Sequence, residues 1–358
     1  MLKKVLPLML VASVSQAAET VHIYNWGEYI APDTLKNFQA QTGIGSQYDV
    51  YDSNETLDAK LMAGHSGYDV VMPSNHFMAR QIQGGALTKL DRSKLPNWNN
   101  LNPVLMKALE ANDPGNQYGF PYLWGTTGIG YNMDKVKAVL GDGVALDSWD
   151  VLFKPENLSK LAKCGVAVLD NGPELLPIAL HRLGLPHHSQ NPEDYKKAEA
   201  LLVEMRQNVT YFHNSKYIAD LANGDVCMAV GFSGDIMQAA NRAKEAGNGV
   251  HVEYIIPKEG APLWFDMVAM PANAPSEAAG YAFMNYLLEP KVMAGISDSV
   301  RYANGNAKAD SLVEPALKAD PTVYPPESVM SSLYALEAMP LKIDRLRTRI
   351  WNKVKSGT

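Results

Sequence analysis

The chain has 358 residues, of which 46% are hydrophobic and 20% are charged, so it is too apolar for a disordered chain and too mixed for a bundle of membrane-spanning helices. At about 150 residues per domain, this length predicts two domains, each able to bury a core of its own. The formal net charge of −6 includes no basic excess, which disfavours nucleic-acid binding and permits a cationic ligand.

The first 17 residues have the layout of a secretory signal peptide. Met1 to Lys4 is a short positive segment, Val5 to Val14 is mostly apolar, and Ser15-Gln16-Ala17 is a small-x-small cleavage pattern. The apolar run is too short to span a bilayer. We therefore predict that residues 1–17 are a signal peptide, with a buried N-terminal helix as the alternative.

Short apolar runs alternate with helical patterns along the rest of the chain. Strands are expected at 21–24, 68–72, 166–169, 226–230, 254–256 and 267–270, and a helix at 32–41. This alternation predicts an α/β fold with largely parallel sheets. The glycine-rich segment 122–132 is expected to cross between two lobes, with a second crossing near 249–254. Two lobes joined in this way would enclose a hinged cleft, a favoured place for a ligand.

The sequence contains two cysteines, Cys164 and Cys227. They show no CxxC or Cys/His spacing of the kind that indicates a zinc site. In an exported protein, a single disulfide is the expected state of such a pair. Two buried free thiols are the alternative.

Motifs for catalysis, cofactors and metals are absent or incomplete. Residues 231–235 begin like a nucleophile elbow but end in Asp, and the glycines of 125–130 lack the spacing of a dinucleotide loop. His187 and His188 lie in a polar loop, and no acidic or histidine partner at suitable spacing completes a metal site. We therefore expect no catalytic residues, no cofactor and no metal.

Acidic and aromatic side chains lie instead at the ends of the expected elements. They are Trp26, Glu28 and Tyr29 after the first strand, Glu174 at a helix start, Asp235 after a strand, Asp266 within an apolar run, and Tyr302. Glu174 is equally explained as a first-turn acid, Asp235 as a helix N-cap, and each aromatic residue as part of the core. Asp266 is harder to explain structurally, because a buried carboxylate without a partner is costly.

Carboxylates and aromatic walls together suit a protonated di- or polyamine. Its ammonium groups need anionic partners, and its methylene groups need apolar contacts. A basic amino acid is less well matched, because its carboxylate would need an arginine, and Arg301 is the only one in these segments.

Many separate segments of the chain resemble one family. They include Tyr24-Asn25-Trp26, Tyr48 to Glu55, Gly67 to Val71, Pro73-Ser74-Asn75, Tyr122 to Thr126, Ser215-Lys216-Tyr217, Ile256 to Gly260 and Tyr324-Pro325-Pro326. In these segments the sequence resembles the bacterial periplasmic putrescine- and spermidine-binding proteins of polyamine ABC transporters. The resemblance implies a two-lobed periplasmic binding protein fold with a hinged ligand cleft, in which each lobe is a mixed sheet flanked by helices.

The resemblance also implies lobe boundaries, partners and a location. The N-terminal lobe would comprise residues 18–123 and 246–292, and the C-terminal lobe residues 124–245 and 293–358. The protein would be a periplasmic monomer that captures a polyamine, spermidine before putrescine, and delivers it to the membrane permease of an ABC transporter. Cadaverine or agmatine as the ligand, an exported enzyme acting on a cationic substrate, and a sensor role remain alternatives.

Individual roles follow from the same resemblance. Trp26, Tyr29, Trp264 and Tyr302 would wall the amine, Asp235 and Asp266 would hold one ammonium group, and Glu174 would serve the distal end; Glu28, Ser74, His76 and Phe232 complete the expected ligand-binding set. Cys164 and Cys227 match the positions of a family disulfide. Glu28 and Trp264 favour spermidine, whereas Gly27, His76, Phe232 and Asn171 depart from the usual patterns.

Overall fold

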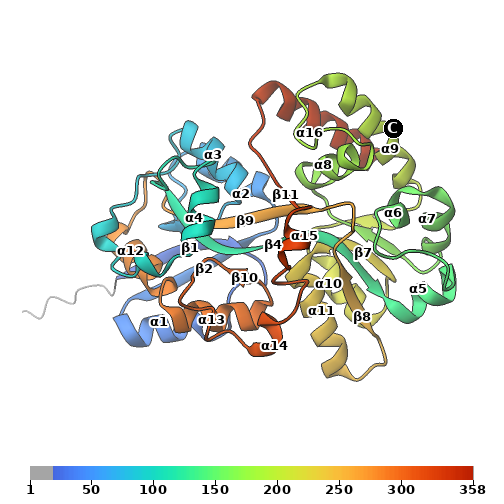
Figure 1. Ribbon diagram of the computed structural model, residues 1–358. Helices are drawn as coiled ribbons and strands as arrows, with labels where there is room; N and C mark the ends of the chain where they lie inside the picture. Colours follow the sequence, from blue (N-terminus) through green and yellow to red (C-terminus); the bar gives the residue numbers. More distant parts are fainter. Residues whose placement is uncertain (1–18, 358) are drawn as a thin grey trace, which may run out of the picture.

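The computed structural model describes residues 19–357, so the expected signal peptide lies outside the described residues. The described strands join into one continuous sheet that runs through two lobes, in the order β2-β1-β3-β9-β4-β7-β5-β6 (Figure 1). Helices cover both lobes, which confirms the expected α/β periplasmic binding protein fold. No helix among residues 19–357 is both long and apolar enough to cross a bilayer.

The N-terminal lobe, on the left of Figure 1, is built from two separate parts of the chain, one before β4 and one from β9 to β11. Its strands are β1 (Thr20–Trp26), β2 (Gly45–Tyr51), β3 (Val70–Val71), β9 (Pro262–Ala269), β10 (Ala303–Asn304) and β11 (Tyr334–Ala335). Its helices are α1 (Thr34–Thr42), α2 (Asn54–Met62), α3 (Asn75–Gln83), α4 (Pro103–Leu109), α12 (Glu277–Leu287), α13 (Pro290–Val300), α14 (Pro315–Lys318) and α15 (Glu327–Met330), with 3-10 turns at Arg92–Lys94 and Trp98–Asn100.

The C-terminal lobe, on the right of Figure 1, comes mainly from the middle of the chain. Its strands are β5 (Val166–Val168), β6 (Tyr211–Phe212), β7 (Met228–Phe232) and β8 (Val252–Ile255). Its helices are α5 (Met133–Leu140), α6 (Asp150–Phe153), α7 (Pro155–Leu161), α8 (Gly172–Arg182), α9 (Pro192–Arg206), α10 (Lys216–Asn223), α11 (Ser233–Ala246) and the C-terminal α16 (Leu341–Ser356).

Strand β4 (Gly119–Asn132) links the lobes, as the glycine-rich segment predicts. Its first half pairs with β9 in the N-terminal lobe, and its second half pairs with β7 and β8 in the C-terminal lobe. These pairings are antiparallel. The expected parallel arrangement holds for β1 with β2 and β3, for β5 with β6 and β7, and for the short strand β11 with β9. Glycine lets β4 pass close to large side chains: a Cβ at Gly125 would lie 2.9 Å from the Trp264 ring.

All the strands expected from apolar runs are present, within a few residues of the expected ends. Strand β2 was not expected, because its segment Gly45–Tyr51 is polar and half-exposed at the sheet edge, where alternation of apolar residues is weak. The second crossing lies later than 249–254. Strand β8 still pairs with the C-terminal half of β4, and the chain enters the other lobe only at β9.

The buried apolar residues form two cores that divide the chain differently from the expected lobes. Val252 and Ala261 belong to the C-terminal core, whereas Trp264 and the segment from Met293 to Leu336 belong to the N-terminal core. The chain returns to the C-terminal core at Ile343, in α16. The expected boundaries at 246 and 293 therefore differ from the structure, because apolar runs identify strands but not the sheet half with which each one pairs.

Cys164 and Cys227 form a disulfide, as expected for an exported chain, with their Cα atoms 5.5 Å apart. The bond joins the turn after α7 to the beginning of β7, next to the C-terminal core. It therefore closes a long loop within one lobe and does not restrain the two lobes relative to each other.

Candidate functional site

A cavity of about 420 Å³ lies between the lobes. Its lining comes from both sides, with β1 and its following loop, α2 and β9 on one side and α8, α10 and α11 on the other. Nine of the eleven expected ligand-binding residues line it, namely Trp26, Tyr29, Ser74, Glu174, Phe232, Asp235, Trp264, Asp266 and Tyr302. Residues separated by more than two hundred positions in the sequence are thus brought to one place.

Asp266 points into the cavity from β9 and is almost completely buried. Its Oδ1 accepts a 2.6 Å hydrogen bond from the Ser74 hydroxyl, and Ser74 is held in turn by Asn54. Burial raises the pKa of Asp266 to about 7, although the Ser74 hydrogen bond and the neighbouring Tyr29 hydroxyl act to lower it. A cation beside Asp266 would therefore stabilise the ionised form of its carboxylate.

Asp235 enters from the C-terminal lobe, in the first turn of α11. The hydroxyls of Tyr217 and Tyr302 each donate a 2.7 Å hydrogen bond to its carboxylate, which fixes the side-chain rotamer. It is the third residue of α11 and does not cap the helix, so the N-cap explanation is wrong. Burial raises the pKa of Asp235 to about 6, against the lowering effect of the two tyrosine hydroxyls.

Glu174 lies in the first turn of α8, where Asn171 caps the helix by accepting the Glu174 N–H at 3.2 Å. Its carboxylate leaves the helix and accepts a 2.7 Å hydrogen bond from the Thr127 hydroxyl on β4. Burial raises the pKa of Glu174 to about 7, and Asp266 adds to this effect while Thr127 and Arg347 oppose it. Glu174 can therefore be both a first-turn acid of α8 and a residue of the candidate site.

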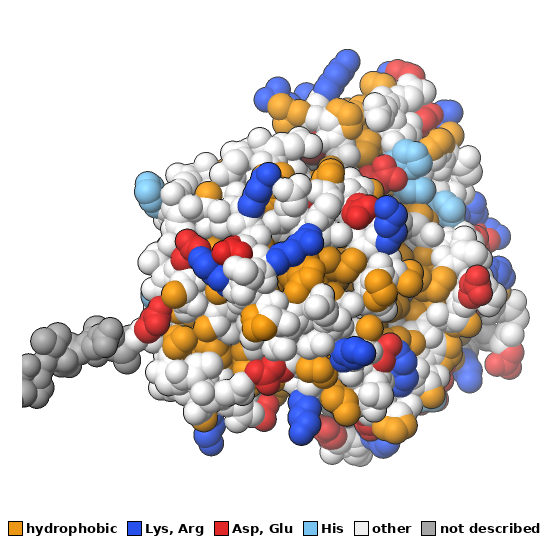
Figure 2. Space-filling view, turned by 60° about the vertical axis from the view of Figure 1, so that its left-hand side comes forward, with side chains coloured by type: hydrophobic (Ala, Val, Ile, Leu, Met, Phe, Trp, Pro, Cys, Tyr) orange, Lys and Arg blue, Asp and Glu red, His pale blue; other side chains and the backbone are white. Residues whose placement is uncertain are grey.

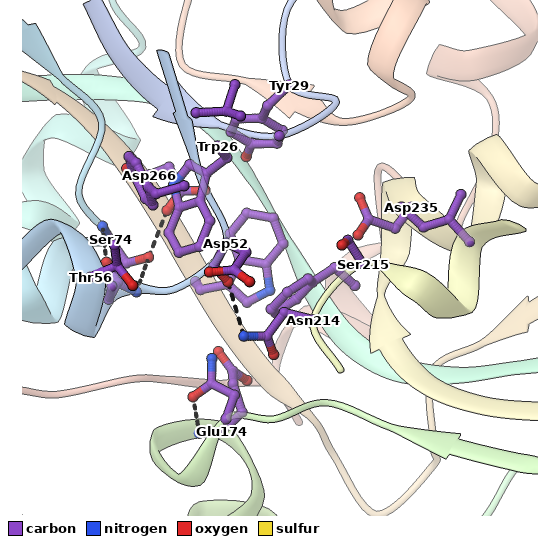
Figure 3. A pocket seen from close by; sticks show the side chains of 18 of the residues that line it. Trp26, Tyr29, Asp52, Thr56, Ser74, Glu174, Asn214, Ser215, Asp235 and Asp266 are labelled. Atoms are coloured by element: carbon purple, nitrogen blue, oxygen red, sulfur yellow. Dashed lines mark hydrogen bonds between the residues drawn. The ribbon is translucent and has the colours of Figure 1, made fainter. Parts of the chain in front are cut away.

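The three carboxylates converge on one space without a protein cation. In Figure 3, Glu174 lies at the lower end of the cavity, and Asp235 and Asp266 lie above it. Within residues 19–357, none of the three makes an ion pair. Buried anions in this arrangement create a strongly favourable site for a cation.

Aromatic rings form the walls between the acidic ends. Trp264 meets Phe232 and Tyr302 edge to face, with ring centroids 5.5 and 5.4 Å apart, and Tyr302 meets Tyr29 at 5.2 Å. The Trp26 indole N–H donates a 2.8 Å hydrogen bond to the Met72 carbonyl, which fixes its ring at the cavity wall. Such walls suit both methylene groups and ammonium groups.

Glu28 and His76, the other two expected residues, do not line the cavity. The backbone of Glu28 has a positive φ of 58°, and its exposed carboxylate pairs with Arg242 of the opposite lobe at 2.7 Å. His76 follows Ser74 by two positions, but α3 begins between them, and helical geometry turns the two side chains apart. Burial and nearby Arg347 and Arg80 lower the pKa of His76 to about 3, so it stays neutral.

Sequence reasoning missed several lining residues, among them Asp52, Thr56, Asn214 and Ser215. The Asn214 amide donates a 2.9 Å hydrogen bond to the Asp52 carbonyl, which joins the two lobes at the cavity (Figure 3). Asp52 and Ser215 fall in segments that carry the resemblance, which is the only signal that could have identified them. Polar residues in loops are otherwise indistinguishable from ordinary solvated positions.

The outer surface differs from the cavity. Figure 2 shows acidic and basic side chains interspersed around an apolar area in the middle of the face, with no extended basic patch on that face. In the cavity, by contrast, three carboxylates of the same sign lie together, buried from solvent.

The chain is similar to known proteins over nearly its whole length. Residues 33–325 match the family described as bacterial extracellular solute-binding proteins. The chain is 56% identical over 349 residues, 97% of its length and 95% of the relative's, to the putrescine-binding periplasmic protein SpuD of Pseudomonas aeruginosa. It is 53% identical, over 98% of its length and 95% of the relative's, to the putrescine-binding periplasmic protein PotF of Escherichia coli.

More distant relatives are named for more than one polyamine. The spermidine/putrescine-binding periplasmic protein of Escherichia coli is 34% identical over 86% of this chain and 83% of its own. Among solved structures, a putative spermidine/putrescine ABC transporter protein from Listeria monocytogenes superimposes with a TM-score of 0.83 at 31% identity, covering 94% of this chain and 99% of its own.

Proposed function

Because the chain belongs to the bacterial extracellular solute-binding proteins, we propose that it captures putrescine in the periplasm and presents it to the permease of an ABC transporter. The observation that carries this proposal is the set of three buried carboxylates, Glu174, Asp235 and Asp266, which converge on an aromatic-walled cavity without a protein cation. A short diamine supplies the two missing positive charges and apolar methylene groups between them.

The distribution of charge supports putrescine over the spermidine expected from Glu28 and Trp264. If Asp235 and Asp266 share one ammonium group and Glu174 takes the other, the third ammonium group of spermidine needs a further anionic partner along the cavity. The remaining acidic residue among the described lining is Asp52, which is exposed, and Asn171 is neutral. Glu28, one of the two residues that favoured spermidine, is paired with Arg242 outside the lining. The relatives at 56% and 53% identity are also named for putrescine.

Ligand capture would work through closure of the lobes. Asp266 and Trp26 lie on the N-terminal side, and Asp235 and Glu174 lie on the C-terminal side, so one diamine contacts both. Its binding favours the closed arrangement by as much as its affinities for the two states differ. In this proposal the protein acts as an exported monomer that binds the amine without chemical change and docks on a membrane partner.

Calorimetric titration of the refolded, ligand-free mature protein with putrescine, cadaverine, agmatine and spermidine tests the proposal. We expect putrescine to bind most tightly, with a Kd of about 1 μM or below, which is about −8 kcal/mol. Mass spectrometry of the recovered amine should show no chemical change. Absence of heat with all four amines, tighter binding of spermidine, or turnover of the amine would contradict the proposal.

A variant pair locates the binding in this cavity. Asp266→Asn removes one anion of a buried ion pair, which costs about 3–5 kcal/mol, so putrescine should bind at least about 100-fold more weakly. Asp52→Asn removes an exposed carboxylate from the lining of the same cavity, and a change below about fivefold is expected. Equal effects of the two substitutions would show that Asp266 does not hold the ammonium group.

A further inference from the structure

Outside the cavity, the loop between α8 and α9 meets the segment that leads from β11 to α16. His187 and His188 lie in the loop, and Glu337 lies in the segment. His188 Nδ1 is 3.2 Å from His187 Nε2 and 4.0 Å from Glu337 Oε1. One ligand atom of each residue lies within 4.8 Å of the others, and within residues 19–357 no other group of three His, Cys, Asp or Glu side chains meets this condition.

These three atoms suit a divalent transition metal. Imidazole nitrogens are preferred ligands of zinc, cobalt, nickel and copper, and a carboxylate oxygen completes many such sites. With metal–nitrogen bonds of about 2.0–2.1 Å, the ligand atoms of a tetrahedral site lie about 3.3 Å apart. The two histidine nitrogens are already at this separation, and Glu337 Oε1, at 4.0 Å from His188 Nδ1, needs to come about 0.7 Å nearer to that atom.

The surroundings orient the site and leave it open. The His187 ring stacks on Tyr334 of β11 with centroids 4.4 Å apart and planes 27° apart, which fixes one ligand against the N-terminal sheet. The side chains of His188 and Glu337 are about half exposed, so they can rotate and water can fill a remaining coordination position. Figure 2 shows histidine side chains grouped beside acidic ones on the molecular surface.

We propose that His187, His188 and Glu337 bind one divalent transition-metal ion of the zinc type. This differs from the sequence-based expectation of no metal, because Glu337 is separated from the histidines by α9 to α15 and only the fold brings it near. The ion would tie a loop of the C-terminal lobe to the segment through which the chain returns from the N-terminal lobe. It is independent of the amine in the cavity, to which none of the three residues contributes.

Calorimetric titration of the mature protein, free of any affinity tag, with zinc chloride tests the proposal. We expect one ion per chain with a micromolar Kd, at least tenfold weaker binding in His188→Ala and Glu337→Gln, and no competition from millimolar magnesium. Cobalt should give the visible absorption bands of a four-coordinate ion. Zinc should also raise the Tm of the unmodified protein but not that of His188→Ala, because only a site present in the folded state stabilises it.

The chain offers a matched control at His251. This exposed histidine lies 3.4 Å from Glu253, so it forms a similar pair, but it has no third ligand. His251→Gln should therefore bind zinc like the unmodified protein. Binding of zinc by His188→Ala as tightly as by the unmodified protein, loss of binding in His251→Gln, or no binding by the unmodified protein would overturn the proposal; circular dichroism confirms that each variant is folded.

Discussion

The raised pKa values in the cavity predict that amine binding weakens steeply in acid. Asp266 and Glu174 have pKa values of about 7 and Asp235 of about 6, each raised mainly by burial. Below these values the empty protein takes up protons that an amine must displace, while the amine itself, with a pKa near that of lysine, stays protonated. Lowering the pH therefore favours the empty state, and raising it favours the complex.

The size of the effect follows from these pKa values. Going from pH 8 to pH 5.5 costs about 30-fold in affinity for each of the two carboxyl groups near 7 and about fourfold for Asp235. If one of the first two must ionise, the loss is at least about 30-fold, and if all three must ionise it reaches about 4,000-fold, or about 5 kcal/mol.

Calorimetry in buffers of different ionisation enthalpy, at constant ionic strength, measures both the affinity and the protons released. With all three groups ionised in the complex, about 1.8 protons should leave per amine at pH 6.5 and about 0.2 at pH 8. Affinities within threefold of each other at pH 8 and 5.5, with no proton released at pH 6.5, would refute the assignment of these carboxylates as the amine's partners.

Three further predictions concern the parts around the cavity. Glu28→Gln removes an exposed inter-lobe ion pair, so putrescine affinity should change by less than about fivefold in calorimetry, and a larger loss would give Glu28 a direct ligand role. Replacing Cys164 and Cys227 by Ser should lower the free energy of unfolding in denaturant titrations by about 4 kcal/mol without altering amine affinity, whereas unchanged stability would contradict the loop-closure argument. Gly234→Ala places a Cβ 2.5 Å from the Tyr302 ring and should weaken putrescine binding at least tenfold, while Gly295→Ala, which meets open space, should not; equal affinities would show that Tyr302 can move freely.

The fold class and most of the cavity could be predicted from the sequence. Apolar runs at β1, β5, β7, β8 and β9 reflect burial, which leaves a direct mark on composition along the chain. Asp266 was identified because a carboxylate within an apolar run conflicts with its surroundings, and such conflicts concentrate at functional sites. Strand β2 left no such mark, because a half-exposed edge strand carries polar side chains on both faces.

Other features depend on relations that the linear order does not contain. Glu28 lies between Gly27 and Tyr29, which both line the cavity. Its own backbone has a positive φ, and its side chain pairs with Arg242 on the opposite lobe. The resemblance puts His76 in the ligand-binding set with Ser74, whereas the start of α3 sends the two side chains in different directions. In both cases a local backbone turn decided which way the side chain points.

The sequence by itself determined that this is a two-lobed α/β protein with acids and aromatic residues suited to a cationic amine. The reason is that the residue type alone fixes the charge of a side chain and its tendency to be buried. Only the tertiary structure decided the lobe boundaries, the convergence of Glu174, Asp235 and Asp266, and the approach of Glu337 to His187 and His188. The physical reason is that strand pairing and lobe contact act between residues far apart in the chain, and their partners are selected by packing that no local pattern records.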